Sequence, residues 1–174
     1  FIIAGQGTVG LEILEQADEA GASIGQVLVC CGGGGLVAGI ATAMRPRLPD
    51  AAIYSVEPAA FDDTARSLTS GTRENVAADA VSICDALLAP TPGALTFPIN
   101  KAFLSGGLAV TDDEVRRAMR YAFEVLKLVV EPGGAVALAA LLAGKAPAAD
   151  GATVVVISGS NVDGGLFAEI IGGD

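Results

Sequence analysis

The apolar residues of this chain fall into short blocks, each about the length of one strand. Two examples are residues 27–31 and residues 154–157, in which every residue is apolar. Strands that are covered by helices on both faces have such continuous apolar runs, because neither side of the strand meets water. We therefore predict strands at residues 26–31, 52–56, 108–110 and 153–157.

Helical spacing and end signals predict the elements that lie between these strands. Thr111 with Glu114 forms a capping box, and Thr8 is a candidate N-cap for the first helix. We read Gly5-Gln6-Gly7-Thr8 as a turn that shapes a domain hinge, and most of residues 70–100 as irregular. The predicted helices are residues 9–20, 36–44, 63–68, 112–127, 135–143 and 163–171. Alternating strands and helices predict an α/β fold with a mostly parallel sheet.

Composition and charge narrow the class of protein. Hydrophobic residues make up 52% of the chain, yet no apolar stretch approaches the roughly 20 residues of a membrane helix. The formal net charge of -10 argues against nucleic-acid binding, which needs a basic surface. The three cysteines, with no histidine, match neither a disulfide framework nor a zinc pattern. We expect buried thiols and a cytoplasmic protein without a membrane or nucleic-acid partner.

A run of four glycines lies between a predicted buried strand and a predicted helix: Gly32, Gly33, Gly34 and Gly35. Ligands of open α/β sheets bind at the carboxyl ends of strands, and a helix N-terminus offers backbone N–H groups to an anion. The run is not a P-loop, because Leu36-Val37 replaces the required Lys-Ser/Thr pair. On local pattern alone, the run fits a phosphate site or a plain turn. It also loosely fits a dinucleotide site, whose acidic residue would be Glu57 at the end of the next strand.

Five short motifs decide among these alternatives. They occur in the order and rough spacing of fold-type II pyridoxal-phosphate (PLP) enzymes: Ile3–Thr8, Gly32–Gly39, Glu57-Pro58, Val130-Glu131-Pro132 and Ser158–Asp163. Over essentially its whole length the chain resembles the serine/threonine dehydratase (threonine ammonia-lyase) and serine racemase branch. This resemblance implies a tryptophan synthase β-like, three-layer α/β sandwich with a mostly parallel sheet. Residues 1–174 would form a single C-terminal portion of the large domain, with the N-terminal lobe missing.

The resemblance also implies which residues meet the cofactor. Gly32 to Gly35 would bind the PLP phosphate, and Ser158 would hydrogen-bond the pyridine nitrogen. A neutral hydroxyl does not force that nitrogen to stay protonated, so the ring is a weaker electron sink, which favours β-elimination. Glu131 matches a glutamate near the active site, although capping of the following helix explains it equally well. Ser160 stands where the family usually has glycine.

An acidic segment after the second strand resembles the cation-binding loop of metal-activated family members. Its ligands would be Glu57, the carbonyl of Phe61 and Asp63, and such oxygen ligands suit Mg²⁺ or Ca²⁺. The alternative is that the aspartates are acids favoured by the helix dipole at the start of a helix. A bound cation would be structural or activating.

The activity that the resemblance implies is PLP-dependent ammonia-lyase, converting L-serine, L-threonine or a related hydroxy amino acid to a 2-oxo acid. An amino-acid racemase, a threonine synthase, a cysteine synthase-like enzyme, a non-catalytic fragment and a dinucleotide-binding domain remain alternatives. PLP enzymes need a Schiff-base lysine, and Lys101, Lys127 and Lys145 lack the family's Ser-x-Lys context. We therefore expect that lysine and the substrate loop to lie in a missing N-terminal part, so that the fragment alone is inactive. The resemblance implies that the full-length protein is a homodimer.

Overall fold

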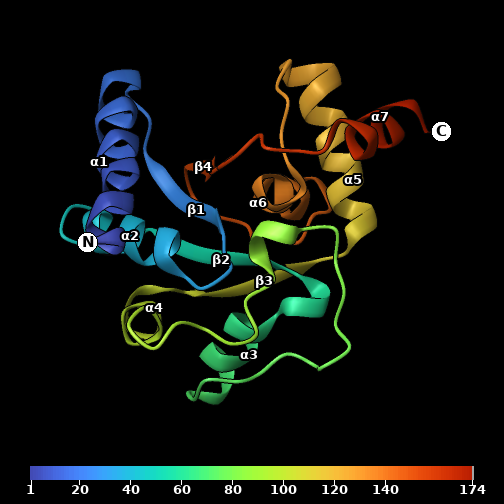
Figure 1. The fold of residues 1–174 in the computed structure, drawn as a ribbon. Helices are drawn as coiled ribbons and strands as arrows, with labels where there is room; N and C mark the ends of the chain where they lie inside the picture. The colour runs from blue at the N-terminus through green and yellow to red at the C-terminus, as the bar shows by residue number, and fades with distance from the viewer. Residues whose placement is uncertain (174) are drawn as a thin grey trace.

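One parallel sheet lies between two layers of helices in the computed structural model, which describes residues 1–173 (Figure 1). Its strands all pair in parallel, in the order β3-β2-β1-β4. They are β1 (Ile24–Cys30), β2 (Ala52–Pro58), β3 (Gly106–Val110) and β4 (Ala152–Val155). The prediction of an α/β fold with a mostly parallel sheet is confirmed.

Helices cover both faces of this sheet. One face carries α1 (Ile2–Ala20), α2 (Gly35–Met44), α3 (Asp63–Ser70) and α4 (Phe97–Phe103). On the other face α6 (Pro132–Leu142) lies against the strands, with α5 (Asp112–Tyr121) and α7 (Gly164–Gly172) outside it. Short 3-10 turns occur at Ala59–Phe61 and Asp85–Leu87, and a π-helical turn at Ala122–Leu126 extends α5. Within residues 1–173, no helix is both long and apolar enough to cross a bilayer.

Strand β1 is apolar at most positions because helices cover both of its sides. Leu28 and Cys30 pack in the cluster that includes α5 and α6, whereas Val27, Val29 and Cys31 pack in the cluster with α1 and α2. Each of these side chains is at most 4% exposed. The continuous apolar run in the sequence is therefore the signature of a central strand.

The first helix begins earlier than the sequence predicts. Residues 5–8 lie within α1, so the predicted turn is wrong. Thr8 is not an N-cap, because its hydroxyl donates to the Gly5 carbonyl inside the helix (2.8 Å). Glycine disfavours the helical conformation, so Gly5 and Gly7 suggest a turn, and the partner of Gly7 in α2 is not visible in the sequence.

The glycines of α1 allow it to approach α2 closely. An added Cβ at Gly7 would lie 3.2 Å from the Gly39 carbonyl oxygen, and one at Gly10 would lie 3.0 Å from the Ile40 carbonyl oxygen. An added Cβ at Gly39 would lie 2.5 Å from the Ile3 carbonyl oxygen. The two helices therefore touch through their backbones.

Helix α4 begins inside a segment that the sequence predicts to be irregular, whereas the N-terminal cap of α5 is as predicted. The segment predicted as irregular contains the start of α4 at Phe97, with Pro98 in the first turn, where its missing N–H costs no helical hydrogen bond. The capping box of α5 is confirmed: Thr111 Oγ1 accepts the Glu114 N–H (3.2 Å), and Glu114 Oε2 accepts the Thr111 N–H (2.7 Å).

Candidate functional site

The sheet reverses its strand order between β1 and β4. The chain proceeds outward from β1 to β2 and β3, then returns to the other side of β1 to form β4. Open α/β sheets bind ligands at the carboxyl ends of the strands beside such a reversal. The segments that follow β1 and β4 are the glycine turn, Gly32–Gly35, and the serine turn, Ser158–Asn161. The topology thus brings the two predicted cofactor-binding segments to one end of the sheet.

The glycine turn connects β1 directly to α2. Gly34 has a φ of +84°, and α2 begins at Gly35. The four backbone N–H groups of residues 32–35 donate no hydrogen bond to any other residue that the structure describes. Donors of this kind at a helix N-terminus suit an anion, and the helix dipole adds partial positive charge. The turn can therefore bind a phosphate group through its backbone alone.

Residues 93–100 hold the glycine turn from one side. The Gly33 carbonyl accepts hydrogen bonds from the Thr96 hydroxyl (2.6 Å) and the Gly93 N–H (3.2 Å). The Gly34 carbonyl accepts one from Asn100 Nδ2 (3.4 Å), and Asn100 is fully buried. In a planar trans peptide the N–H points opposite to the carbonyl, so the N–H groups of the next residues point away from this segment.

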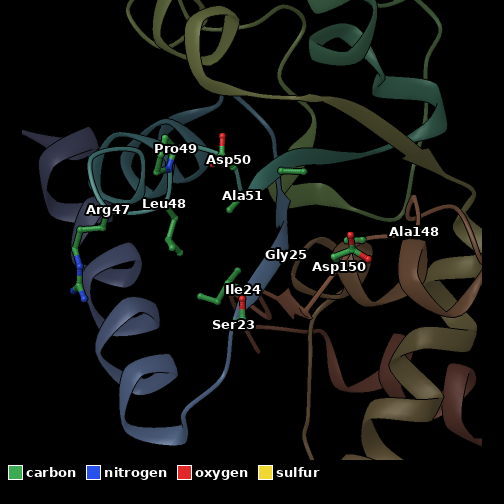
Figure 2. Close-up of a pocket in the computed structure, with 12 residues that line it drawn as sticks. Ser23, Ile24, Gly25, Arg47, Leu48, Pro49, Asp50, Ala51, Ala148 and Asp150 are labelled. Carbon is green, nitrogen blue, oxygen red and sulfur yellow. The ribbon is translucent and has the colours of Figure 1, made fainter.

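A hollow of about 410 Å³ adjoins the glycine turn. Gly33, Gly35, Leu95 and Thr96 line it together with the start of α1. A second hollow, of about 580 Å³, lies at the opposite end of the sheet, around Ser23 and Leu48 (Figure 2). None of the residues predicted to bind the cofactor lines this second hollow. Two of the predicted phosphate-binding residues, Gly33 and Gly35, line the hollow beside the glycine turn, but Ser158 does not.

Ser158 lies just beyond the end of β4 and is exposed. Its Oγ accepts a hydrogen bond from Cys30 Sγ at 3.0 Å, and Cys30 is the last residue of β1. Within the described part of the chain, the Ser158 hydroxyl donates to no acceptor. Its proton is therefore available to a ligand that lies beside the serine turn.

Glu131 is the N-cap residue of α6, and its carbonyl accepts the Ala135 N–H (3.1 Å). Its side chain makes no capping hydrogen bond and contacts the serine turn instead. Oε2 accepts the Asn161 N–H (2.9 Å), and the Glu131 N–H donates to the Gly159 carbonyl (3.0 Å). An added Cβ at Gly159 would collide with the Glu131 carboxylate. Glu131 therefore holds the turn that carries Ser158.

The predicted metal ligands Glu57 and Asp63 are both buried. Glu57 Oε1 accepts the Thr64 N–H (2.9 Å) and Oε2 accepts the Ala65 N–H (2.8 Å), so the carboxylate satisfies the first turn of α3. Burial raises the pKa of Glu57 to about 8 and that of Asp63 to about 6. Asp63 Oδ2 is buried and has no hydrogen-bond partner among the described residues.

A divalent cation would fit these observations. It would give the orphaned Asp63 oxygen a partner and favour the ionised forms of both buried carboxyl groups. The neighbouring Asp62 already pairs with Arg66 (2.7 Å), so it is occupied elsewhere. No three His, Cys, Asp or Glu side chains gather as a metal cluster within residues 1–173. The predicted set has two carboxylates and one carbonyl, and the donors present suit a hard cation.

The lysines do not contribute to the candidate site. Lys101 Nζ donates to the Gly71 carbonyl (2.9 Å), and Lys127 Nζ donates to the Glu124 carbonyl (2.7 Å). Lys145 pairs with Glu114 (2.6 Å). Each amine is bound locally, and the structure shows no hydrogen bond from a described lysine to the glycine turn or to Ser158.

Sequence reasoning missed three residues that shape the site. Cys30 was assigned only to the core, and Thr96 and Asn100 fell in or beside the segment predicted as irregular. The last two contact glycines more than 60 positions earlier in the chain. No local sequence pattern signals such contacts, which exist only once the sheet and α4 are in place.

Comparisons with known proteins agree with this geometry. The family model described as pyridoxal-phosphate dependent enzyme matches residues 1–159. Serine racemase of Dictyostelium discoideum is 38% identical over 175 residues, which covers 98% of this chain and 52% of the relative. L-threonine ammonia-lyase of Geobacter sulfurreducens is 40% identical over 163 residues, which covers 94% of this chain and 39% of the relative. The chain thus spans about half the length, or less, of these curated relatives.

Solved structures give the same result. A threonine deaminase of known crystal structure, from the organism abbreviated T.th., superposes with a TM-score of 0.87 at 40% identity, covering 92% of this chain and 54% of that one. Maize serine racemase superposes with a TM-score of 0.85 at 36% identity, and the match covers 96% of this chain and 50% of the racemase chain. The fold-type II PLP architecture that the resemblance implied is therefore confirmed.

Proposed function

The chain belongs to the pyridoxal-phosphate dependent enzymes, and on this premise we propose that the whole protein is an ammonia-lyase. Its substrates would be L-threonine, L-serine or a related hydroxy amino acid, and its products a 2-oxo acid and ammonia. One observation carries the proposal: the unpartnered N–H groups of the glycine turn and the available hydroxyl of Ser158 lie at the same strand reversal. Several relatives are named threonine ammonia-lyase or threonine dehydratase.

The residues of this chain would bind and orient the cofactor. The glycine turn would hold the phosphate, and the Ser158 hydroxyl would donate a hydrogen bond to the ring nitrogen. PLP, when bound, supplies the electron sink that weakens the bonds at the substrate's Cα. Because Ser158 is neutral, it leaves the ring nitrogen unprotonated, which favours prompt loss of a β-hydroxyl over a long-lived carbanion. The amine that attaches the cofactor would come from outside residues 1–174.

A second candidate is a serine racemase. The observation that favours it is the 38% identity to the Dictyostelium discoideum enzyme over nearly the whole chain. Both reactions begin with loss of a proton from Cα and use the same cofactor contacts. They differ in what happens next, so they can be separated by their products.

Product analysis of the full-length protein tests these alternatives. With PLP and L-threonine or L-serine, we expect 2-oxo acid to form steadily, while chiral analysis of the remaining amino acid shows little D-isomer. Rapid D-serine formation with little 2-oxo acid would favour the racemase instead. Tight NAD binding with no response to PLP would contradict both. Residues 1–174 alone are expected to give no turnover. Turnover by this segment would contradict the proposal that the amine that attaches the cofactor lies outside it.

We also propose that Glu57, the Phe61 carbonyl and Asp63 hold a structural or activating divalent cation. The unpartnered, buried oxygen of Asp63 and the full burial of Glu57 support this proposal. Oxygen donors favour Mg²⁺ or Ca²⁺ over softer metals. Bound metal would tie the end of β2 to the start of α3.

Melting of the full-length protein with and without metal tests the cation site. Saturating Mg²⁺ or Ca²⁺ is expected to raise Tm by several degrees, because a ligand that binds only the folded state stabilises it. Asp63→Asn should remove most of this rise. Asp62→Asn is the matched control, because Asp62 pairs with Arg66, and it should keep the rise. An unchanged Tm at saturating metal would refute the site.

A further inference from the structure

Cys30 is a buried thiol that the cofactor contacts proposed above leave unused. We propose that Cys30 is a positioning residue, whose S–H group holds the Ser158 hydroxyl so that the serine's own proton points toward the cofactor's ring nitrogen. This inference rests on the proposed function, since it needs PLP beside Ser158. It assigns a role to a residue that touches neither the cofactor nor the substrate.

Cys30 and Ser158 differ in how deeply they are buried. Cys30 ends the central strand β1 and is 4% exposed, so its position is fixed by the sheet and by packing. Ser158 lies beyond the last residue of β4 and is exposed. The 3.0 Å hydrogen bond from Cys30 Sγ to Ser158 Oγ therefore connects an exposed hydroxyl to a buried side chain of the central strand.

The direction of this hydrogen bond decides what the serine can do. A serine hydroxyl has one proton to donate and two lone pairs that can accept. When the thiol donates to one lone pair, the serine proton must point elsewhere, and the described chain offers it no acceptor. The ring nitrogen of a bound PLP would be such an acceptor. A thiolate at Cys30 would instead accept a hydrogen bond from the Ser158 hydroxyl, so the serine proton would point toward the sulfur.

The surroundings of Cys30 keep it in the donating form. Burial raises the pKa of the Cys30 thiol, and the negative charge of Glu131 adds to the rise, although the hydrogen bond to Ser158 partly opposes it. Because a raised pKa means that the neutral form persists to higher pH, Cys30 remains a thiol at neutral pH. Glu131 also secures the serine turn through Asn161.

The adjacent Cys31 does not share this role. Successive residues of a strand point to opposite faces, and Cys31 Sγ lies 3.5 Å from Thr64 Oγ1 on the other side of the sheet. The two thiols therefore do not act as a pair. Cys84 lies in the same core cluster as Cys30 and is fully buried, but its thiol has no hydrogen bond to Ser158. It offers a matched control.

A double-mutant cycle on PLP binding tests the inference in the full-length protein. The PLP dissociation constant of the apo-protein is measured for Cys30→Ala, Ser158→Ala and the double variant. Cys30→Ala should weaken binding roughly fivefold, about the effect of one hydrogen bond, but should have no effect when Ser158 is already alanine. Cys30→Ser, which keeps a donor, should restore binding. Cys84→Ala should bind PLP as the unaltered protein does.

The possible outcomes separate the inference from the proposed function. If Cys30→Ala weakens binding equally in both backgrounds, or not at all, the thiol does not act through Ser158 and the inference is wrong. Cys30→Val, which removes the donor but keeps an apolar side chain, gives the same comparison if Cys30→Ala does not fold. If the unaltered full-length protein binds no PLP, the proposed function fails and the inference fails with it.

Discussion

Replacing Gly34 with alanine in the full-length protein is expected to weaken PLP binding by about 100-fold. Gly34 has a φ of +84°, a conformation that costs an L-residue roughly 1–2 kcal/mol. The new Cβ would also lie 2.5 Å from Asn100 Nδ2 and 3.1 Å from Thr96 Oγ1. The turn must shift, and its N–H groups then no longer converge. Loss of two hydrogen bonds to a charged phosphate, at about 1.5 kcal/mol each, corresponds to that change in affinity.

Fluorescence titration of the apo-protein with PLP measures this effect. Gly71→Ala is the matched control, because Gly71 also has a left-handed φ, of +77°, but caps the end of α3. Its added Cβ would meet mainly the flexible end of Lys101. Gly71→Ala should carry the same backbone cost of a left-handed φ as Gly34→Ala. It should leave the PLP dissociation constant unchanged. Unaltered PLP affinity in Gly34→Ala would show that the turn does not hold the phosphate.

Replacing Gly39 with alanine is expected to lower the free energy of unfolding by about 3 kcal/mol, at the upper end of overpacking effects. The added Cβ would lie 2.5 Å from the Ile3 carbonyl oxygen and 2.7 Å from the Gly7 nitrogen. Both atoms belong to the backbone of α1, so no side chain can rotate away to make room. The two helices would have to separate, and α1 would lose its packing against α2.

Urea denaturation of the full-length protein, compared between variants, tests this prediction. Gly5→Ala is the control, because an added Cβ at Gly5 meets no atom within 4 Å. Since alanine favours the helix over glycine by up to about 1 kcal/mol, Gly5→Ala should raise the urea midpoint slightly. A midpoint for Gly39→Ala equal to that of the unaltered protein would mean that α1 does not pack as described.

Local signals in the sequence were sufficient to predict the central architecture. The run of apolar residues in β1, the four glycines and the start of α2 form a strand-to-helix turn whose parts are adjacent in sequence. The capping box of α5 depends on Thr111 and Glu114, which lie within one helical turn. Such features arise from short-range sterics and hydrogen bonds, so they can be read from a single sequence.

Features that depend on tertiary packing were not predictable in the same way. The glycines at positions 5 and 7 predict a turn if helix propensity alone decides, but both lie inside α1, where Gly7 packs closely against Gly39 of α2. Asn100 and Cys30 acquire their roles from partners 66 and 128 positions away. For the cofactor site, the sequence supplied Gly32–Gly35 and Ser158 through a family resemblance. The strand order then gives a physical reason for their proximity.

In the proposed site, the backbone N–H groups of residues 32–35 hold the phosphate of PLP. Amide hydrogen exchange of the full-length protein tests it most directly, with PLP compared against pyridoxal, which lacks the phosphate. We predict that the amides of residues 32–35 exchange fast in the apo-protein, slow markedly with PLP, and stay fast with pyridoxal. Binding of PLP that leaves exchange at residues 32–35 unchanged, or equal protection by pyridoxal, would contradict the claim.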